Sequence, residues 1–419
     1  MELVSGPPPE RLRIAAVTDQ GSSPLPLEGI RVLDVATVIA GPGVCARLGD
    51  FGADVIKIEH PKIGDTTRNL GWKVQDVALW WKHISRNKRP ITLNLSHPEG
   101  QELLLRLVDT ADVMVESFRP GTLEKWNLPP ERLQERNPKL VLLRNSAFGQ
   151  TGPYSKRPGF GTLAEAISGL AHMTGFPDRG PVLPSIALAD EVAAIVGAYA
   201  VMVALYHRDL HDGPGQVIDA SLFESLFQIT GPLAAAYEKL GIVEERRGNR
   251  LNFAAPRGAY ETKDGRWVAL SGTAQSVAER IITAIGRPDL ITDERFATNS
   301  ARMENVEELD RLIQEWMSHH NLAEVVETFE QHDAALAPIY DIEQIYADPQ
   351  YKARGTIIHV PDEELGELPF VKPQPTLSET PGRIRHAGLP RAAANEEIYI
   401  KELGLTEEEL ERLREEGVI

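Results

Sequence analysis

Along the first 150 residues, short apolar runs alternate with longer stretches in which apolar residues recur every three or four positions. The short runs predict buried β-strands, and the patterned stretches predict amphipathic helices. Leu103, Leu104, Leu107 and Val108, for example, share one helix face just before an apolar run. Strands that alternate with helices predict βαβ units around a parallel sheet. We expect strands within residues 30–36, 53–60, 90–95, 112–118 and 139–149.

The pattern changes after Gly241. Two strand-like runs flank Lys263, Asp264 and Gly265, and an Asp-Gly pair favours a tight hairpin turn. Two amphipathic helical patterns follow, so this part predicts a smaller α+β domain. At 419 residues the chain exceeds the roughly 250 to 300 residues at which single cores stop growing. We expect a flexible extension, a large α/β domain, a small α+β domain and a return segment that completes the large domain, at residues 1–26, 27–225, 226–335 and 336–419.

Composition narrows the classes of function. A formal net charge of -17 argues against a general nucleic-acid binder. One cysteine, Cys45, leaves no basis for an internal disulfide or a cysteine-rich metal site, and its setting predicts core packing. No stretch approaches 18 consecutive apolar residues, and no leader-like apolar segment begins the chain. We therefore expect a cytoplasmic protein with no membrane partner.

Asp190 stands out because small apolar residues surround it on both sides, at 186–189 and 192–198. These residues predict a helix with a carboxylate near its start. Such an acid either complements the helix dipole, which stabilises by about 0.3 to 1 kcal/mol, or serves a function. Local sequence leaves both interpretations open.

Four basic residues, Lys82, Arg86, Lys88 and Arg89, occur in an eight-residue stretch without an acid. Such a cluster could bind ligand phosphates or form a solvated face. Gly41, Gly43 and Ala46 match a dinucleotide-binding spacing only loosely, so the sequence gives little support to a nicotinamide site.

Several segments together resemble the class III CoA-transferase family, which includes formyl-CoA transferase and carnitine CoA-transferase. The matching segments between residues 27 and 222 are LEGIRVLDVATVIAGPGVCARLGDFGADVIKIEHPKIGDTTR, NKRPITLNL, ADVMVESFRPGTLEKW, FGQTGP, ALAD and GPGQVIDASL. The resemblance implies a Rossmann-like large domain, built from both ends of the chain, and a smaller α+β domain. It also implies a homodimer of two interlocked subunits.

The resemblance also implies aspartyl chemistry. Asp190 would be the nucleophile that attacks an acyl-CoA thioester, and a carboxylic acid would finally accept the CoA. No metal and no permanently bound cofactor would be needed, since coenzyme A thioesters are the substrates. Gly272, between Ser271 and Thr273, stands where formyl-CoA transferases have a glycine-rich catalytic loop.

For CoA, the family pattern implies contacts near the first strand-helix turn and the next strands. By position these contacts are Val38, His60, Lys88, Arg89, Phe118 and Lys125. His60 and Lys125 stand where formyl-CoA transferases have Arg, and Ile39 stands where they have a Gln near the acyl group. Oxalate and formate are therefore not the expected acids.

Two alternatives stay open. An α-methylacyl-CoA racemase needs a His in a G-H-D motif, but this chain has Gly159, Phe160 and Gly161, and Phe cannot exchange a proton. The acid that formyl-CoA transferases have at position 161 is also absent, and Glu165 is either its substitute or a helix-surface residue. A non-catalytic CoA-binding subunit is the second alternative, although it would have no use for the carboxylate of Asp190.

The substrate is less defined. Arg157 and Arg179 lie in sequence on either side of an apolar tract, and a pair of guanidinium groups suits a second carboxylate. We therefore expect succinyl-CoA as donor and a dicarboxylic or aromatic-substituted acid as acceptor, with solvent exposure of both Arg residues as the alternative.

Overall fold

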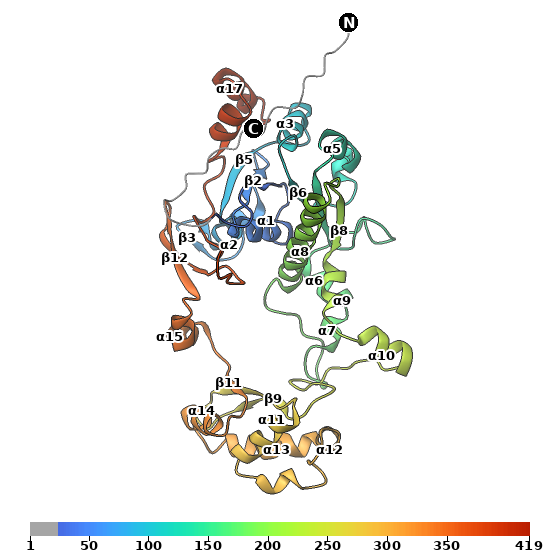
Figure 1. Cartoon of the computed structure of the whole chain (residues 1–419), viewed down its shortest axis with the longest axis vertical. Coiled ribbons are helices and arrows are strands. Elements are labelled where there is room, and N and C mark those ends of the chain that lie inside the picture. Colours follow the sequence, from blue (N-terminus) through green and yellow to red (C-terminus); the bar gives the residue numbers. More distant parts are fainter. Residues whose placement is uncertain (1–23) are drawn as a thin grey trace. The chain divides into compact units, whose positions relative to one another are not determined.

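The structure is a computed structural model that describes residues 24–419. Residues 1–23 of the expected flexible extension lie outside the described part. The chain forms two compact units (Figure 1). Unit 1 contains the described residues up to Ser168, Pro184–Gly231 and Gly355–Ile419, and unit 2 contains Gly169–Leu183 and Pro232–Arg354.

A six-stranded sheet forms the centre of unit 1, and all its strand pairs are parallel. The strands lie in the order β5-β2-β1-β6-β7-β8, which is 3-2-1-4-5-6 when only these six strands are counted. This is the order of a Rossmann-type sheet, so the predicted parallel α/β architecture is confirmed. The strands are β1 (Arg31–Asp34), β2 (Asp54–Glu59), β5 (Lys88–Thr92), β6 (Val113–Glu116), β7 (Val141–Ser146) and β8 (Val217–Ser221).

Helices cover both faces of this sheet (Figure 1). Because side chains of a strand alternate between faces, Val32 and Leu33 enter different cores. Val32 packs with residues of α1 (Ala40–Asp50) and α8 (Leu188–Leu210). Leu33 packs in the core that contains residues of α3 (Pro98–Val108), α5 (Pro130–Arg136) and α17 (Glu407–Glu415).

Helix α8 is long and apolar enough to cross a membrane by length and composition alone. Packing in the core explains this apolar composition, because Ala194, Val201, Ala204 and Leu205 pack against the sheet. Cys45 of α1 is fully buried in the same core, as expected, and burial raises the pKa of its thiol well above the ordinary range.

The acid-rich C-terminal helix α17 is solvated on one side only. Leu410 and Leu413 are only 3% exposed and join the core that contains residues of α3, together with Val418 and Ile419. Two apolar residues three positions apart are enough to bury one side of a helix while the acids face solvent.

Shorter elements complete unit 1. They are η1 (Thr66–Asn69), β3 (Lys73–Val74), β4 (Val77–Ala78), α2 (Leu79–Ile84), α4 (Thr122–Lys125), α6 (Gly161–Ile167), α9 (Leu222–Gln228), the hairpin of β12 (Ile357–Asp362) and β13 (Gly366–Val371), and the π-helix η3 (Glu396–Glu402). The return segment is tied to β5 by Tyr399, whose hydroxyl donates to the Thr92 carbonyl oxygen at 2.7 Å.

Unit 2 is built around a three-stranded antiparallel sheet in the order β11-β10-β9. The predicted hairpin is confirmed as β9 (Arg257–Glu261) and β10 (Trp267–Ser271), and β11 (Leu336–Pro338) pairs with β10. One core joins this sheet to α11 (Gln275–Ala284), α13 (Val306–Met317) and α14 (Leu322–Gln331). The other elements of unit 2 are α7 (Leu170–Met173), α10 (Leu233–Leu240), η2 (Pro288–Ile291), α12 (Asn299–Glu304), α15 (Ile342–Ala347) and α16 (Pro349–Ala353).

Candidate active site

A pocket of about 310 Å³ lies at the carboxyl ends of β1, β6 and β7. Strand order reverses between β1 and β6, and ligands of open α/β sheets bind in the crevice at this point. Thr37 and Val38 line the pocket after β1, Ser117 and Phe118 after β6, and Asp190 from α8. All residues that line it belong to unit 1.

The loop after β1 has an unusual backbone at Val38. Its φ of 70° lies in the left-handed region, which β-branched residues rarely adopt. Neighbouring side chains hold this loop in place. The Ser117 hydroxyl accepts the Thr37 N–H at 2.9 Å and lies 3.3 Å from the Thr37 carbonyl oxygen, and an Asp65 carboxylate oxygen accepts the Val38 N–H at 3.4 Å. Strained backbone persists where surrounding contacts fix it, as here at the pocket.

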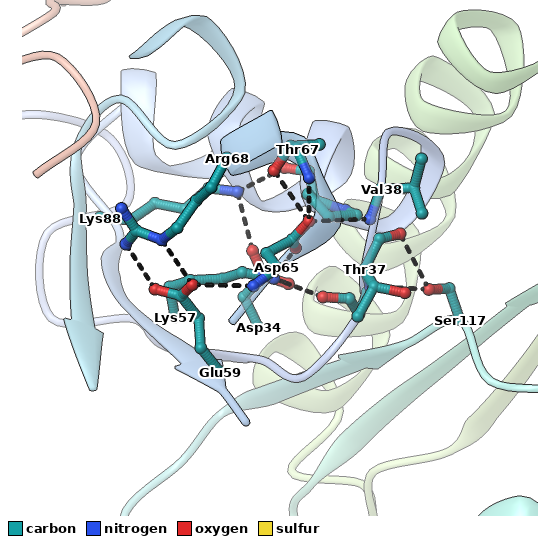
Figure 2. A network of polar contacts seen from close by, with 12 residues as sticks. Asp34, Thr37, Val38, Lys57, Glu59, Asp65, Thr67, Arg68, Lys88 and Ser117 are labelled. Atoms are coloured by element: carbon teal, nitrogen blue, oxygen red, sulfur yellow. Dashed lines mark hydrogen bonds and ion pairs between the residues drawn. The ribbon is translucent and has the colours of Figure 1, made fainter. Parts of the chain in front are cut away.

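A buried network of charges supports that loop (Figure 2). Lys57 contacts Asp65 at 2.8 Å and Asp34 at 3.6 Å, and its ammonium group also donates to the Ala36 carbonyl oxygen. Lys88 donates to Asp34 at 2.7 Å. Burial alone would lower the pKa of Lys57, but the two carboxylates raise it above its ordinary value. Each buried charge in this network therefore has an oppositely charged partner.

The network continues to the end of β2. Glu59 is paired with Arg68 at 2.6 Å and accepts the Asp65 N–H at 2.9 Å. The Arg68 guanidinium lies 3.5 Å from the centre of a Trp81 ring, a cation-π contact. Three acids and three cations thus balance one another beside the pocket.

Asp190 lies in the first turn of α8, and Gly161 is what gives its carboxylate room. A Cβ atom placed on Gly161 would lie only 2.1 Å from Asp190 Oδ2. Any side chain at position 161 would therefore displace this carboxylate. Gly161, which stands where formyl-CoA transferases have an acid, is thus the residue that the Asp190 carboxylate packs against.

Glu165 lies beside this carboxylate. It is only 3% exposed, and its Oε1 accepts the Ala189 N–H at 3.3 Å, whereas Ala187, the residue that begins α8, provides no side-chain cap. The interpretation of Glu165 as a helix-surface residue is therefore wrong, because its side chain is buried in unit 1. Burial and the negative charges of Glu165 and Glu191 raise the pKa of Asp190 to about 6.

No ion pair among residues 24–419 includes Asp190 or Glu165. Glu191, the neighbour of Asp190, is by contrast paired with Arg47 at 2.5 Å. Asp190 therefore differs from a capping acid, because it is half-buried beside a like charge and faces a pocket. A carboxylate in this setting is poorly solvated and has space in front of it, and its role as a nucleophile stays a prediction.

The structure brings some of the expected CoA contacts to the pocket and places others elsewhere. Val38 and Phe118 line it. Lys88 is fully buried against Asp34, and Arg89 is paired with Asp54 and Glu402, so both have partners inside the protein. These ion pairs favour structural roles, and contact of the two residues with CoA stays a prediction.

His60 and Lys125 are not among the residues that line the pocket. His60 is half-buried after β2, where burial and Lys62 lower the pKa of its ring. Lys125 is exposed at the end of α4. Both side chains remain accessible at the edges of unit 1, and their contact with CoA stays a prediction.

Of the two arginines expected to bind a carboxylate, Arg157 lines the pocket and stacks at 3.7 Å on Tyr154. Both Arg157 and Arg179 are solvent-exposed, as the alternative interpretation expected, so their binding of a carboxylate stays a prediction. Arg179 and Gly272 belong to unit 2. The Gly272 N–H is donated to the Pro256 carbonyl oxygen at 2.7 Å, and a Cβ on Gly272 would meet the Pro256 ring at 2.9 Å. Close packing against Pro256 therefore explains the glycine in unit 2.

The pocket also contains residues that the sequence did not single out, notably Asn145, Ser146, Ser155 and Arg119. The sequence carried only a weak signal for Asn145, because it lies between Arg144 and Ser146 at the polar end of a strand that begins with apolar residues. Among residues 24–419, no group of three or more His, Cys, Asp or Glu side chains is placed to hold a metal ion.

Comparison with known proteins agrees with this geometry. The succinyl-CoA:L-malate CoA-transferase beta subunit of Chloroflexus aurantiacus is 42% identical, over 96% of this chain and 100% of its own. The succinyl-CoA:D-citramalate CoA-transferase of the same organism is 40% identical over 94% of this chain and 98% of its own. A CAIB/BAIF family protein from Brucella suis matches with a TM-score of 0.79 and 32% identity, over 90% of this chain and 100% of its own.

Residues 27–396, nearly the whole described chain, match the sequence pattern of CoA-transferase family III. The Rossmann-type sheet, the pocket at its switch point and these relatives lead to one conclusion: the chain belongs to CoA-transferase family III and is a transferase.

Proposed function

We propose that this enzyme moves CoA from succinyl-CoA to a second dicarboxylic acid through an aspartyl-CoA intermediate on Asp190. The observation that carries the proposal is the position of Asp190. Its carboxylate faces the pocket over Gly161, with no cation of the described residues at ion-pair distance and with a pKa raised to about 6. At neutral pH it is ionised, yet it is less stabilised than a solvated or paired carboxylate.

The proposed reaction proceeds in four acyl transfers. An Asp190 oxygen attacks the succinyl carbonyl carbon, the C–S bond breaks, and a mixed anhydride and CoA thiolate result. The thiolate attacks the aspartyl carbonyl carbon, which forms aspartyl-CoA and releases succinate. The acceptor carboxylate attacks this thioester and again displaces the thiolate, and the thiolate then attacks the acceptor carbonyl of the second anhydride. Product acyl-CoA leaves and the Asp190 carboxylate is restored, so no redox change and no net proton transfer occurs.

The pocket suits these steps because an anhydride must be protected from water. Gly161, Ala40 and Leu222 surround the space near Asp190 with small or apolar groups. We assign the Gly272 loop a role in the cycle only by family resemblance, since its own N–H is already bonded to Pro256. No permanently bound cofactor or metal takes part in the proposed scheme.

Arg157 supports a dicarboxylic substrate. Its guanidinium lines the pocket with Asp190 and is orientated by the Tyr154 ring, and it has no acid partner among the described ion pairs of residues 24–419. An unpaired guanidinium suits the distal carboxylate of a succinyl group. Two relatives of similar length use succinyl-CoA with L-malate or D-citramalate, so we propose a C4 or C5 diacid as acceptor.

The racemase alternative is disfavoured by the same pocket. Two-base racemisation needs a second proton-exchanging group, and position 160 holds an exposed Phe160 instead. A non-catalytic CoA-binding subunit is disfavoured by the unpaired Asp190, which serves no binding purpose.

We also propose a cytoplasmic, interlocked homodimer. Helix α8 exposes a row of large apolar side chains that its packing on the sheet leaves uncovered: Ile195, Tyr199, Met202, Val203, Tyr206 and Leu210. Exposed apolar surface of this extent is typical of a subunit interface. Native mass spectrometry should give a dimer of one chain. A monomer would contradict this part, and dimers formed only with a second gene product would replace it by the alpha-beta arrangement named for some relatives.

The direct test is an acceptor screen. Purified enzyme should convert succinyl-CoA and malate, citramalate or glutarate into succinate and the new CoA thioester, and it should release little free CoA without acceptor. Plain hydrolysis, or racemisation of a 2-methylacyl-CoA without transfer, would overturn the proposal.

A further inference from the structure

Asn145 carries a buried amide that its neighbours in unit 1 leave unsatisfied. Asn145 is only 1% exposed, yet neither its Nδ2 nor its Oδ1 has a hydrogen-bond partner in the described part of the chain. Within residues 24–419 it is the one side chain with two such atoms. Buried amides in native proteins are nearly always satisfied, so an unsatisfied amide at a pocket indicates a missing ligand contact.

Most other buried atoms without a hydrogen bond belong to charged groups that are compensated locally. Asp34 and Asp65 each contact a lysine through an ion pair, and Glu402 contacts Arg31 and Arg89. The Ser85 hydroxyl is a single such atom, and Ser85 is not among the residues that line the pocket. Arg302 leaves one nitrogen free while its guanidinium binds three oxygens. Asn145 has no such compensation.

Asn145 lies near the end of β7, on the face that α8 covers. Its Nδ2 is 3.9 Å from the position of a Cβ on Gly197 of α8. Asp190 is seven residues earlier, which is two helical turns and therefore the same side of α8. Both residues line one pocket, with Asp190 half-buried and Asn145 almost fully buried. The amide is thus placed to contact a part of the substrate acid away from the carboxylate that receives CoA.

We infer that Asn145 is a specificity-determining residue that binds a hydroxyl group of the acceptor acid; this inference rests on the proposed CoA transfer. An amide offers both a donor and an acceptor, and a hydroxyl can satisfy both atoms, whereas a carboxylate would leave Oδ1 without a donor. A site built for a hydroxyl rejects analogues that lack it, because its own polar atoms are then left unpaired. The enzyme should therefore favour hydroxy-dicarboxylic acids over the matching diacids.

The test uses two acceptors that differ only by a hydroxyl, citramalate and methylsuccinate, with succinyl-CoA as donor. The wild type should show a kcat/KM at least about tenfold higher for citramalate. Asn145→Leu, of similar volume, should bring the ratio close to one by lowering the rate with citramalate and not with methylsuccinate. Succinyl-CoA-dependent labelling of Asp190, trapped with hydroxylamine, should stay unchanged in this variant.

Four results would overturn the inference. The first is a wild-type ratio near one, as when a water molecule satisfies the amide, and the second is an unchanged ratio in Asn145→Leu. The third is an equal loss with both acids, and the fourth is use of neither acid. Where Asn145→Leu does not fold by circular dichroism, Asn145→Ser takes its place and should lower the ratio in the same direction. Failure of the proposed function is a separate result, since it would abolish Asp190 labelling in the wild type.

Discussion

Two groups of buried charges border the same pocket, and they differ in how they are compensated. Around Lys57, each carboxylate contacts a cation: Asp34 and Asp65 contact lysines, and Glu59 contacts Arg68 (Figure 2). Asp190 at the start of α8 and Glu165 of α6 lie close together, and no ion pair within residues 24–419 includes either of them. The first group holds the Thr37–Val38 loop, and the second contains the proposed nucleophile.

The difference shows how burial separates structure from chemistry. Removing a charge from water is unfavourable unless a partner replaces the water, so a paired network is stable and chemically quiet. An unpaired carboxylate keeps its raised free energy and raised pKa for use in a reaction. Neighbouring charges in one fold can thus have opposite roles.

The largest effect is expected from removal of the proposed nucleophile. Asp190→Asn keeps the size of the side chain but removes the carboxylate, so kcat/KM for CoA transfer should fall by about a thousandfold or more. Glu191→Gln is the matched control, because it changes the adjacent acid, which is paired with Arg47. Initial rates with succinyl-CoA and an accepted diacid measure both, and similar losses in the two variants would refute the assignment.

Lys57→Met tests the paired group. Asp34 and Asp65 would lose their shared cation in a fully buried site, so the free energy of unfolding should fall by about 3 to 5 kcal/mol. Urea unfolding followed by circular dichroism measures it. Arg311→Met, which removes an exposed ion pair with Glu308, should change stability little. An equally small effect at Lys57 would show that the network is not structural.

Gly161→Ala tests whether the Asp190 carboxylate needs the space that a glycine leaves at position 161. The new Cβ would lie 2.1 Å from Oδ2, so the carboxylate must move and kcat/KM should fall by about a hundredfold. Gly180→Ala has open space around its Cβ and serves as control. Normal activity of Gly161→Ala would mean that the observed position of Asp190 is not the reactive one.

Removal of a charge should have opposite effects on stability in the two groups: Lys57→Met should lower the free energy of unfolding, whereas Asp190→Asn should raise it. The folded-state pKa of Asp190, about 6, exceeds its ordinary value of 3.8, so its ionisation weakens the fold as pH rises from about 4 to 6. Above pH 6, the free energy of unfolding of Asp190→Asn should therefore exceed that of the wild type by about 1 to 2 kcal/mol after allowance for partial exposure. Unfolding at pH 8 and pH 4 measures this, and no difference at pH 8 would contradict it.

The smallest expected effect is on the pH profile. Because the nucleophile must be ionised, kcat/KM should fall below about pH 6 and lose tenfold per further pH unit. Glu165→Gln removes the nearest like charge, so the pKa of Asp190 and the midpoint should move down towards 3.8. An unmoved midpoint would place the titrating group elsewhere.

Much of unit 1 follows from the sequence, because apolar runs and helical spacing depend on burial, which the parallel sheet imposes on both faces. The apolar setting of Asp190 is likewise visible along the chain. Pairing between distant residues is not. Lys88 and Arg89 look like a basic cluster, while their partners Asp34 and Asp54 come from other strands.

Contacts of Asp190 with Gly161 and Glu165 likewise span more than twenty residues, so sequence spacing gave no sign of them. The same applies to Asp65, which no motif singled out and which supports Val38 through a single hydrogen bond. Residues that act through tertiary contacts need the fold before their roles can be read.

The central claim is that the unpaired Asp190 carries the acyl group and the CoA in turn. Its most direct test is mass spectrometry of the enzyme after incubation with succinyl-CoA and trapping with hydroxylamine or borohydride. The account predicts a hydroxamate or a reduced side chain on the peptide that contains Asp190, and none in Asp190→Asn. A wild-type enzyme that transfers CoA while Asp190 stays unmodified, or that carries the modification on Glu165, would contradict the account.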